Sequence, residues 1–172
     1  DGLRTNRATT AQVLAVLGSV EDDVVACFRH GGGVPYARYR RFHDVMAEES
    51  DGTVLPSLDQ ILGLVPGLSV RLAAGLGVID LGCGRGRALN QLARRFPRSR
   101  FTGYDLSEEA IAFARAEAGR IGNTNVSFVV RDLSDFDRTA RTDAFDLALT
   151  FDAIHDQAKP KALLAGIRRT LA

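Results

Sequence analysis

The 172-residue chain has two cysteines, no tryptophan, two lysines and no excess of either charge sign. Cys27 and Cys83 are too few for a disulfide framework, and no Cys/His cluster has zinc spacing, so we expect no metal. The formal net charge of +1 argues against a broadly basic nucleic-acid surface. These shortages exclude a disulfide scaffold and disfavour a nucleic-acid partner.

Long apolar runs and targeting segments are also missing. No stretch is apolar enough to span a bilayer and no secretory signal is visible, so we expect no membrane partner and a reduced, cytoplasmic location. An apolar content of 45% fits an ordinary globular α/β protein. The chain begins at Asp1 without a methionine and stops after an amphipathic segment, which predicts an excised piece of a longer protein.

Two regions differ in their sequence pattern. Residues 1–75 predict a helical N-terminal region, with one helix carrying Tyr36, Tyr39 and Phe42. Residues 76–172 alternate between short apolar runs and helical patterns, which predicts a Rossmann-like α/β domain with a parallel sheet in the order 3-2-1-4. The sheet would be truncated before a fifth strand, and its apolar edge favours homo-oligomerisation. The expected strands are 76–81, 100–105, 126–131 and 145–151, and the expected helices 86–95, 108–119 and 157–171.

The most informative segment covers residues 78–87 and reads VIDLGCGRGR. An apolar run ends in Asp80, then Gly82, Gly84 and Gly86 lead directly into a helical pattern. Glycines in such a turn let a ligand approach the bare backbone, and the helix start offers free N–H groups. A tight turn chosen only for packing is the alternative interpretation.

Acidic residues follow the second and third expected strands, at the edge where open α/β sheets bind ligands. Asp105, with Leu106 beside it, is placed to accept hydrogen bonds from both hydroxyls of a ribose. Asp132 is placed to accept from an adenine amino group, with Leu133 against the ring. The simpler interpretations are a helix N-terminal acid for Asp105 and a solvated loop acid for Asp132.

The fourth expected strand ends in Phe151 and Asp152, and His155 and Asp156 follow within one turn. These residues fall at the same edge of the predicted sheet as the acids. An imidazole at this place is a candidate general base, because histidine changes its protonation near neutral pH. A polar residue at a helix start is the alternative for His155.

Together these features resemble the class I S-adenosylmethionine-dependent methyltransferases over residues 76–172. The resemblance implies S-adenosylmethionine as cofactor, S-adenosylhomocysteine as product and methyl transfer to an unidentified small-molecule acceptor. Family members have three further strands that this chain lacks. The cofactor-binding residues that the resemblance implies are Asp80, Gly82, Gly84, Gly86, Asp105, Leu106, Asp132, Leu133 and Phe151, with His155 as the catalytic candidate.

Residues 28–36, FRHGGGVPY, and the following Tyr39 and Phe42-His43 resemble a narrower group. These are bacterial methyltransferases with a winged-helix-like N-terminal region, often described as transcriptional regulators. In that group the tyrosines lie over the cofactor pocket, which implies that Tyr36 and Tyr39 contact the cofactor. A packed helix face is the alternative, because the two tyrosines are three residues apart.

Two other functions stay open at this point. A non-catalytic S-adenosylmethionine-binding regulator fits the winged-helix resemblance, and Arg38, Arg40 and Arg41 are its best basic cluster. An NAD(P)-dependent oxidoreductase shares a glycine turn and an acid after the second strand. Its fingerprint is G-x-G-x-x-G, however, whereas the run here is G-x-G-x-G. Methyl transfer is the function that the sequence favours.

Overall fold

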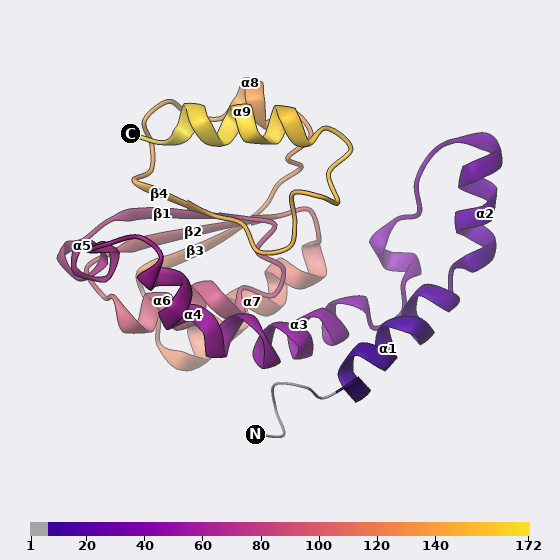
Figure 1. The fold of residues 1–172 in the computed structure, drawn as a ribbon, viewed down its shortest axis with the longest axis horizontal. Helices are drawn as coiled ribbons and strands as arrows, with labels where there is room; N and C mark the ends of the chain where they lie inside the picture. The colour runs from indigo at the N-terminus through magenta and orange to yellow at the C-terminus, as the bar shows by residue number, and fades with distance from the viewer. Residues whose placement is uncertain (1–6) are drawn as a thin grey trace. The chain divides into compact units, whose positions relative to one another are not determined.

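A computed structural model of the chain describes residues 7–172 and divides into two compact units, Asp1–Thr53 and Val54–Ala172 (Figure 1). The sequence pattern changes at residue 75, whereas this division falls between Thr53 and Val54. The reason is that the two helices before residue 75 contribute Leu58, Leu62, Leu68 and Leu72 to the core of the second unit. Within residues 7–172, no helix combines the length and the apolar character that crossing a membrane requires.

The N-terminal unit contains α1 (Arg7–Gly18), α2 (Glu21–His30), the short 3-10 helix η1 (Tyr36–Arg38) and α3 (Phe42–Gly52). Gln12 joins α1 to α3, because its Nε2 donates to Glu48 Oε2 at 2.9 Å. The expectation of one helix from Tyr36 onward is wrong. The backbone of Tyr39 is extended and Arg41 has a φ of 60°, so the α-helix begins only at Phe42.

The second unit is built on a four-stranded parallel sheet of β1 (Gly77–Leu81), β2 (Arg100–Asp105), β3 (Val126–Val130) and β4 (Leu147–Leu149). The order is β3-β2-β1-β4, which confirms the predicted topology. β4 is shorter than the expected 145–151, because Phe145 instead forms a parallel bridge with Leu171. All four strands run the same way, so their carboxyl ends meet at one edge.

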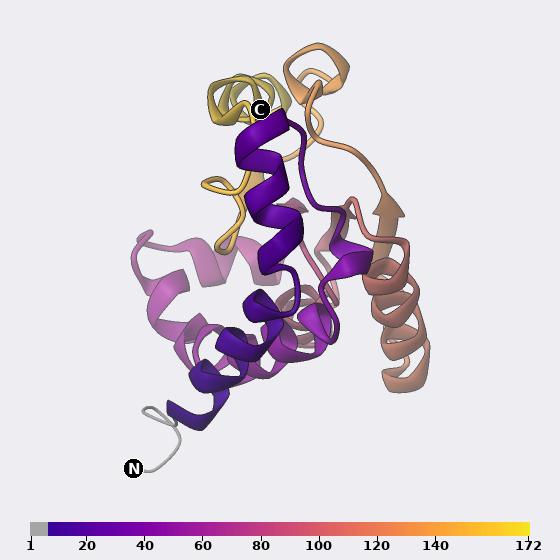
Figure 2. The same ribbon diagram turned by 90° about the vertical axis from the view of Figure 1, so that its right-hand side faces the viewer.

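Helices cover both faces of this sheet (Figure 1). One face carries α4 (Val54–Gly63), α6 (Arg87–Arg95) and α7 (Glu108–Ile121), and the other carries α8 (Phe136–Thr139) and α9 (Pro160–Thr170). Figure 2 shows α8 and α9 side by side. α5 (Leu68–Ala74) lies at the end of the sheet where β1 begins.

Local sequence explains where the helices of the second unit begin and end. Ser107 Oγ accepts a hydrogen bond from Ala110 N at 3.2 Å and caps α7, which Gly122 ends with a φ of 76°. α9 begins at Pro160 rather than at the expected residue 157, because proline suits the first turn of a helix.

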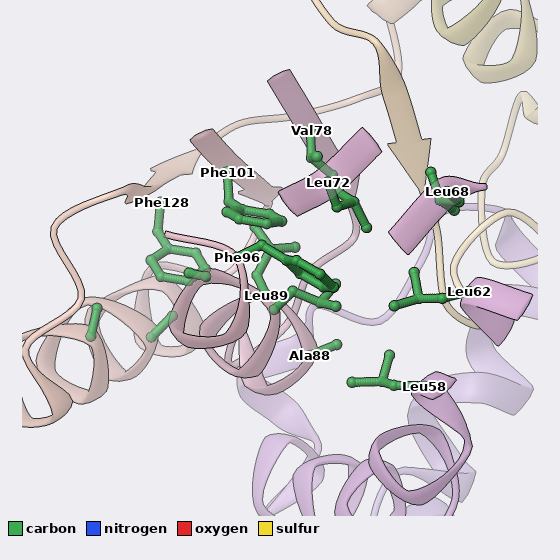
Figure 3. Packing of buried hydrophobic residues seen from close by; sticks show 14 of the residues in the cluster. Leu58, Leu62, Leu68, Leu72, Val78, Ala88, Leu89, Phe96, Phe101 and Phe128 are labelled. Carbon is green, nitrogen blue, oxygen red and sulfur yellow. The ribbon is translucent and has the colours of Figure 1, made fainter. Parts of the chain in front are cut away.

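Two apolar clusters hold the sheet, one under each helical layer. The first joins α5, α6 and β2 through Leu72, Leu89 and Phe101 (Figure 3). The second contains Leu81, Phe136 and Leu163, from β1, α8 and α9. Neighbouring residues of a strand point to opposite faces. Leu81 points to the second cluster, so Asp80 lies on the face of the first cluster.

Candidate functional site

The ends of the first three strands are hydrogen-bonded to one another around Asp105. The carbonyl of Tyr104 accepts from Gly82 N at 2.8 Å and from Cys83 N at 3.0 Å, which ties the glycine turn to β2. The carbonyl of Asp105 accepts from Arg131 N at 2.8 Å, which ties the end of β3 to the same place. The sequence-predicted turn and ribose acid are therefore neighbours in space.

The Asp105 carboxylate is oriented by two backbone donors. Its Oδ2 accepts from Gly84 N at 2.8 Å and its Oδ1 accepts from Ser107 N at 2.9 Å. A carboxylate oxygen can accept two hydrogen bonds, so each oxygen keeps capacity for a ligand hydroxyl. The side chain is half-buried, which favours a fixed orientation over a solvated one.

The three glycines of the turn have positive φ angles, but packing constrains them differently. A Cβ on Gly82 would collide with Ala153, and a Cβ on Gly86 would lie 2.5 Å from Phe128 Cε1. A Cβ on Gly84 would meet no protein atom within 4 Å. Internal packing therefore accounts for glycine at positions 82 and 86. The space beside Gly84 is open and leaves room for a ligand.

Asp80 is a buried acid behind this turn. It is 2% exposed, and its Oδ1 has no hydrogen-bond partner among the described residues. Burial first, and the charge of Asp105 second, raise the pKa of Asp80 to about 8. The Asp80 carboxyl is therefore mostly protonated at neutral pH. Burial, followed by the charges of Asp80 and Asp105, also raises the pKa of the Cys83 thiol, which disfavours a nucleophilic role for Cys83.

The residues predicted to hold adenine lie in different environments. Asp132 is exposed, and its Oδ1 accepts from Ser134 N at 2.8 Å. Leu106 is 55% exposed, so it offers apolar surface next to Asp105. Leu133 is buried in the second apolar cluster beside Phe136, so its side chain is committed to the core. An adenine contact of these residues stays a prediction.

The segment after β4 returns to the glycine turn. Ala153 is the residue that a side chain at Gly82 would meet, and Phe151 packs partly against the first apolar cluster. His155 is 66% exposed, with Nε2 at 3.3 Å from Asp156 Oδ1 and Nδ1 at 3.7 Å from Asp152 Oδ1. Two carboxylates thus flank one accessible imidazole.

Tyr36 and Tyr39 belong to the N-terminal unit, where they form part of a ring cluster. The Tyr36 ring centroid lies 5.1 Å from that of Phe42 and 5.7 Å from that of His43. The Tyr39 ring lies 6.0 Å from Phe42. Aromatic packing therefore accounts for the spacing of the tyrosines without a regular helix face, and their role at the cofactor stays a prediction.

Sequence reasoning missed an arginine contact that links the glycine turn to α7. Arg85 Nη2 lies 2.5 Å from Glu109 Oε1, and its guanidinium carbon lies 4.6 Å from the Phe113 ring centroid. The available signal was an arginine inside the turn together with an acid in the first turn of α7. Among the described residues, no three His, Cys, Asp or Glu side chains gather into a metal-binding group.

A parallel sheet with polar groups at the carboxyl ends of its strands defines a Rossmann-like ligand-binding domain. The chain belongs to the methyltransferase domain family, which matches residues 72–172 and thus more than half of its length. The resemblance seen in the sequence is therefore confirmed at the level of the family, a class I S-adenosylmethionine-dependent methyltransferase domain.

Several curated relatives align with part of this chain. A trans-aconitate 2-methyltransferase from Acidovorax sp. strain JS42 is 36% identical over 95 residues, which cover 55% of this chain and 34% of the relative. A malonyl-[acyl-carrier protein] O-methyltransferase from Bacillus cereus is 30% identical over 45% of this chain and 26% of its own length. A tRNA (guanine-N(7)-)-methyltransferase from Porphyromonas gingivalis is 33% identical over 43% of this chain and 31% of its own length. The aligned segment spans about a third of these relatives or less.

Solved structures share the fold. The [4+2]-cyclase SpnF is 25% identical with a TM-score of 0.53, covering 60% of this chain and 40% of the cyclase. A SAM-dependent methyltransferase from Aquifex aeolicus is 20% identical with a TM-score of 0.50, covering 56% of this chain and 50% of the other. The cyclase is named for a reaction other than methyl transfer, so the fold by itself does not decide the chemistry.

Proposed function

We propose that this chain binds S-adenosylmethionine at the carboxyl ends of β1–β3 and serves methyl transfer to a small-molecule acceptor. The observation that carries the proposal is the hydrogen bond from Gly84 N to Asp105 Oδ2. It brings an open backbone turn and an acid with spare hydrogen-bonding capacity to one place. Membership of the methyltransferase domain family supports the same reaction.

The residues present fit the parts of the ligand. The open space beside Gly84 suits the methionine tail, and an ammonium group next to the unpartnered Oδ1 of Asp80 would favour the ionised carboxylate over the protonated form. Asp105 would accept from the ribose hydroxyls. Asp132, Leu106 and the backbone at Leu133 would contact the adenine. Gly82 and Gly86 would keep the shape of the turn, and Phe151 would lie at the methionine end.

When bound, S-adenosylmethionine supplies a methyl group on a positively charged sulfur that leaves readily as a neutral thioether. The main task of the protein is then to align the acceptor atom with the methyl carbon and the sulfur. For a hydroxyl or carbon acceptor, His155 would take the proton while the acceptor forms its bond to carbon and the electrons of the breaking C–S bond pass to sulfur. Asp156 and Asp152 lie beside this imidazole and would orient it.

The acceptor is proposed to be a small molecule. Two relatives are named for methylating trans-aconitate and malonyl-[acyl-carrier protein], both of which carry carboxyl groups. A third is named for a tRNA guanine, so acceptors differ among proteins that share this segment. A hydroxyl acceptor is the class that an exposed imidazole base beside β4 would serve best, whereas a carboxylate acceptor needs no base because it is already ionised.

We also propose that this chain is related to the bacterial methyltransferases with a winged-helix-like N-terminal region and that Tyr36 and Tyr39 contact the cofactor. The glycine-rich segment before the tyrosines is the sequence feature that supports this, and Gly31 and Gly32 have φ angles of 75° and 97° there. Tyr36 is 39% exposed despite its ring contacts, so it keeps surface for a ligand. Tyr36→Ala and Tyr39→Ala should each weaken S-adenosylhomocysteine binding, whereas unchanged affinity would contradict the assignment.

A reducing, cytoplasmic location and homo-oligomerisation complete the proposal. Cys27 and Cys83 are both free thiols, which supports a reducing compartment. β4 lies at the edge of the sheet, and the partly buried Leu147 and Leu149 leave apolar surface there, which supports self-association. Light scattering over a range of protein concentrations tests this point, and a monomer at every concentration would contradict it.

The test of the proposed function is a transfer assay with methyl-labelled S-adenosylmethionine. The chain is incubated with a panel of small carboxylic acids and phenols, and both the labelled product and S-adenosylhomocysteine are quantified. The Asp105→Asn variant serves as the matched control because it keeps the shape of the side chain. Equal amounts of product from the Asp105→Asn variant and the unaltered chain would contradict methyl transfer by this chain. The absence of turnover with every acceptor, despite cofactor binding, would contradict it as well.

A further inference from the structure

Five exposed arginines gather at the end of the sheet opposite to the candidate site. Arg71 lies on α5, Arg94 and Arg95 form the last turn of α6, and Arg98 and Arg100 lead into β2. We call these five residues the arginine face. Figure 1 shows α5 at the end of the sheet where β1 begins, away from the strand ends that carry the site.

Hydrogen bonds hold the segments of the arginine face together. Ser99, between Arg98 and Arg100, is fully buried, and its Oγ donates to the carbonyl of Leu72 on α5 at 2.6 Å. The same oxygen accepts from Leu76 N at 2.9 Å. Asn125 Nδ2 donates to the carbonyl of Ala93 on α6 at 3.1 Å and to that of Ser99 at 2.8 Å. The arginines are therefore anchored on one rigid backbone surface.

Acidic residues neutralise this face only in part. Between residues 60 and 104 the only acid is Asp80, which is buried at the other end of β1. Arg95 pairs with Asp59 on α4. The nearest acid at the start of the sheet, Asp146, uses Oδ2 to accept from Gly77 N at 2.7 Å. Within residues 7–172, the other four arginines make no side-chain hydrogen bond or ion pair.

Helix electrostatics explain only part of the cluster. Arg71, Arg94 and Arg95 lie in the last turns of helices, where a cation is favourable. Arg98 and Arg100 lie outside any helix, and gathering like charges gives no folding benefit by itself. Val70, next to Arg71, is 74% exposed on a helix that buries Leu68 and Leu72, so it adds apolar surface beside the arginines.

We propose that the arginine face, together with Val70, docks an acidic protein partner. Arginine pairs with carboxylates in a bidentate geometry and is enriched in protein interfaces. An exposed valine adds apolar contact to such an interface, whereas it has no part in phosphate binding. The two aromatic rings nearest to the face, Phe96 and Phe101, are buried and cannot stack on nucleic-acid bases. Protein carboxylates therefore match this surface better than a nucleic acid does.

The experiment measures binding of a labelled helical peptide that carries glutamates on one face and leucines beside them. Probes for comparison are the same peptide with serine in place of leucine, and a duplex RNA. The charge-reversal pair Arg98→Glu/Arg100→Glu is compared with the matched pair Lys159→Glu/Lys161→Glu, two exposed residues at the N-terminal end of α9. If the first pair does not fold by circular dichroism, Arg94→Glu/Arg98→Glu replaces it.

We expect the leucine-bearing peptide to bind, with an affinity that falls as salt screens the charges. Reversal at the arginine face should reduce its affinity at least about tenfold, while the α9 pair changes it by less than about twofold. S-adenosylhomocysteine affinity should stay the same in the Arg98→Glu/Arg100→Glu variant, because the face is remote from the site. Equal loss in the two variants, equal binding of the serine peptide, tighter binding of the RNA, or no binding at all would each overturn the proposal.

Discussion

The backbone N–H of Gly84 donates a 2.8 Å hydrogen bond to Oδ2 of Asp105, which follows it by 21 positions. Through this bond the acid at the end of β2 fixes the glycine turn at the end of β1. Oδ1 of the same acid accepts a hydrogen bond from Ser107 N, which fixes the orientation of the carboxylate. Two elements that bind a ligand in open α/β sheets are thus joined before any ligand arrives, so the site is preorganised.

Replacing Asp105 tests this relationship. In Asp105→Asn the side chain keeps its shape but loses its charge and one acceptor position. Charge-assisted hydrogen bonds contribute roughly 1.5–3 kcal/mol each, so S-adenosylhomocysteine should bind at least about tenfold more weakly. Calorimetric titration measures the change, and circular dichroism checks the fold. An affinity equal to that of the unaltered chain would remove Asp105 from the binding site.

The glycines of the turn should respond differently to the same substitution. In Gly84→Val the new side chain meets no protein atom near its Cβ but occupies the proposed ligand space, so the chain should lose ligand binding, with a stability loss limited to the backbone strain of valine at a φ of 52°. In Gly86→Val the side chain would meet Phe128 and Ala114 in addition to the strain of a φ of 66°, so the chain should lose more stability. Thermal unfolding and ligand titration of both variants separate the two effects. Normal ligand affinity in Gly84→Val would show that the turn has a purely structural role.

The buried Asp80 predicts a dependence of stability on pH. Its pKa is about 8 in the folded chain against 3.8 as the ordinary value, so folding takes up a proton between these limits. Stability from this group is therefore fully present below the unfolded pKa and falls as pH rises toward 8, by at most about 1.4 kcal/mol per pH unit. Above pH 8 the contribution no longer changes.

The Asp80→Asn variant isolates this effect, because asparagine does not titrate. The difference in unfolding free energy between the variant and the unaltered chain should shift in favour of the variant from pH 5 to pH 8. Denaturant titrations at several pH values in this window provide the measurement. Parallel stability curves for the two proteins would mean that Asp80 is already ionised in the folded state.

The sheet was predictable from the sequence because each strand is a short apolar run bounded by clear turn or capping residues. The start and the end of α7 follow from local features, the capping Ser107 and the terminating Gly122. Local pattern failed where backbone geometry intervened. The left-handed φ of Arg41 delays α3, and the bridge between Phe145 and Leu171 shortens β4.

The candidate site was predictable only in part. Asp105 and the glycines could be identified because they follow strands, and the carboxyl ends of parallel strands meet at one edge of a sheet. Sequence could not reveal that packing against Phe128 explains Gly86 while open space surrounds Gly84. The burial of Leu133 also depends on the second helical layer, because α8 and α9 supply its neighbours. These are tertiary contacts, which no local pattern encodes.

His155 should act on turnover rather than on cofactor affinity if it is the base. In an assay with an accepted hydroxyl substrate, His155→Ala is expected to lower kcat by roughly 10²-fold or more at unchanged S-adenosylhomocysteine affinity. The pH–rate profile should lose its acidic limb. His30→Ala, an exposed histidine of the N-terminal unit, is the matched control. Weaker cofactor binding in His155→Ala would instead indicate a binding role.

Calorimetric titration of S-adenosylhomocysteine into the unaltered chain, with NAD⁺ titrated in parallel, tests the central claim most directly. The account predicts one S-adenosylhomocysteine site per chain and no binding of NAD⁺, because the strand-end acids and the turn around Gly84 match the former ligand. Binding of NAD⁺ in its place, or no heat from either ligand with a folded protein, would contradict the account.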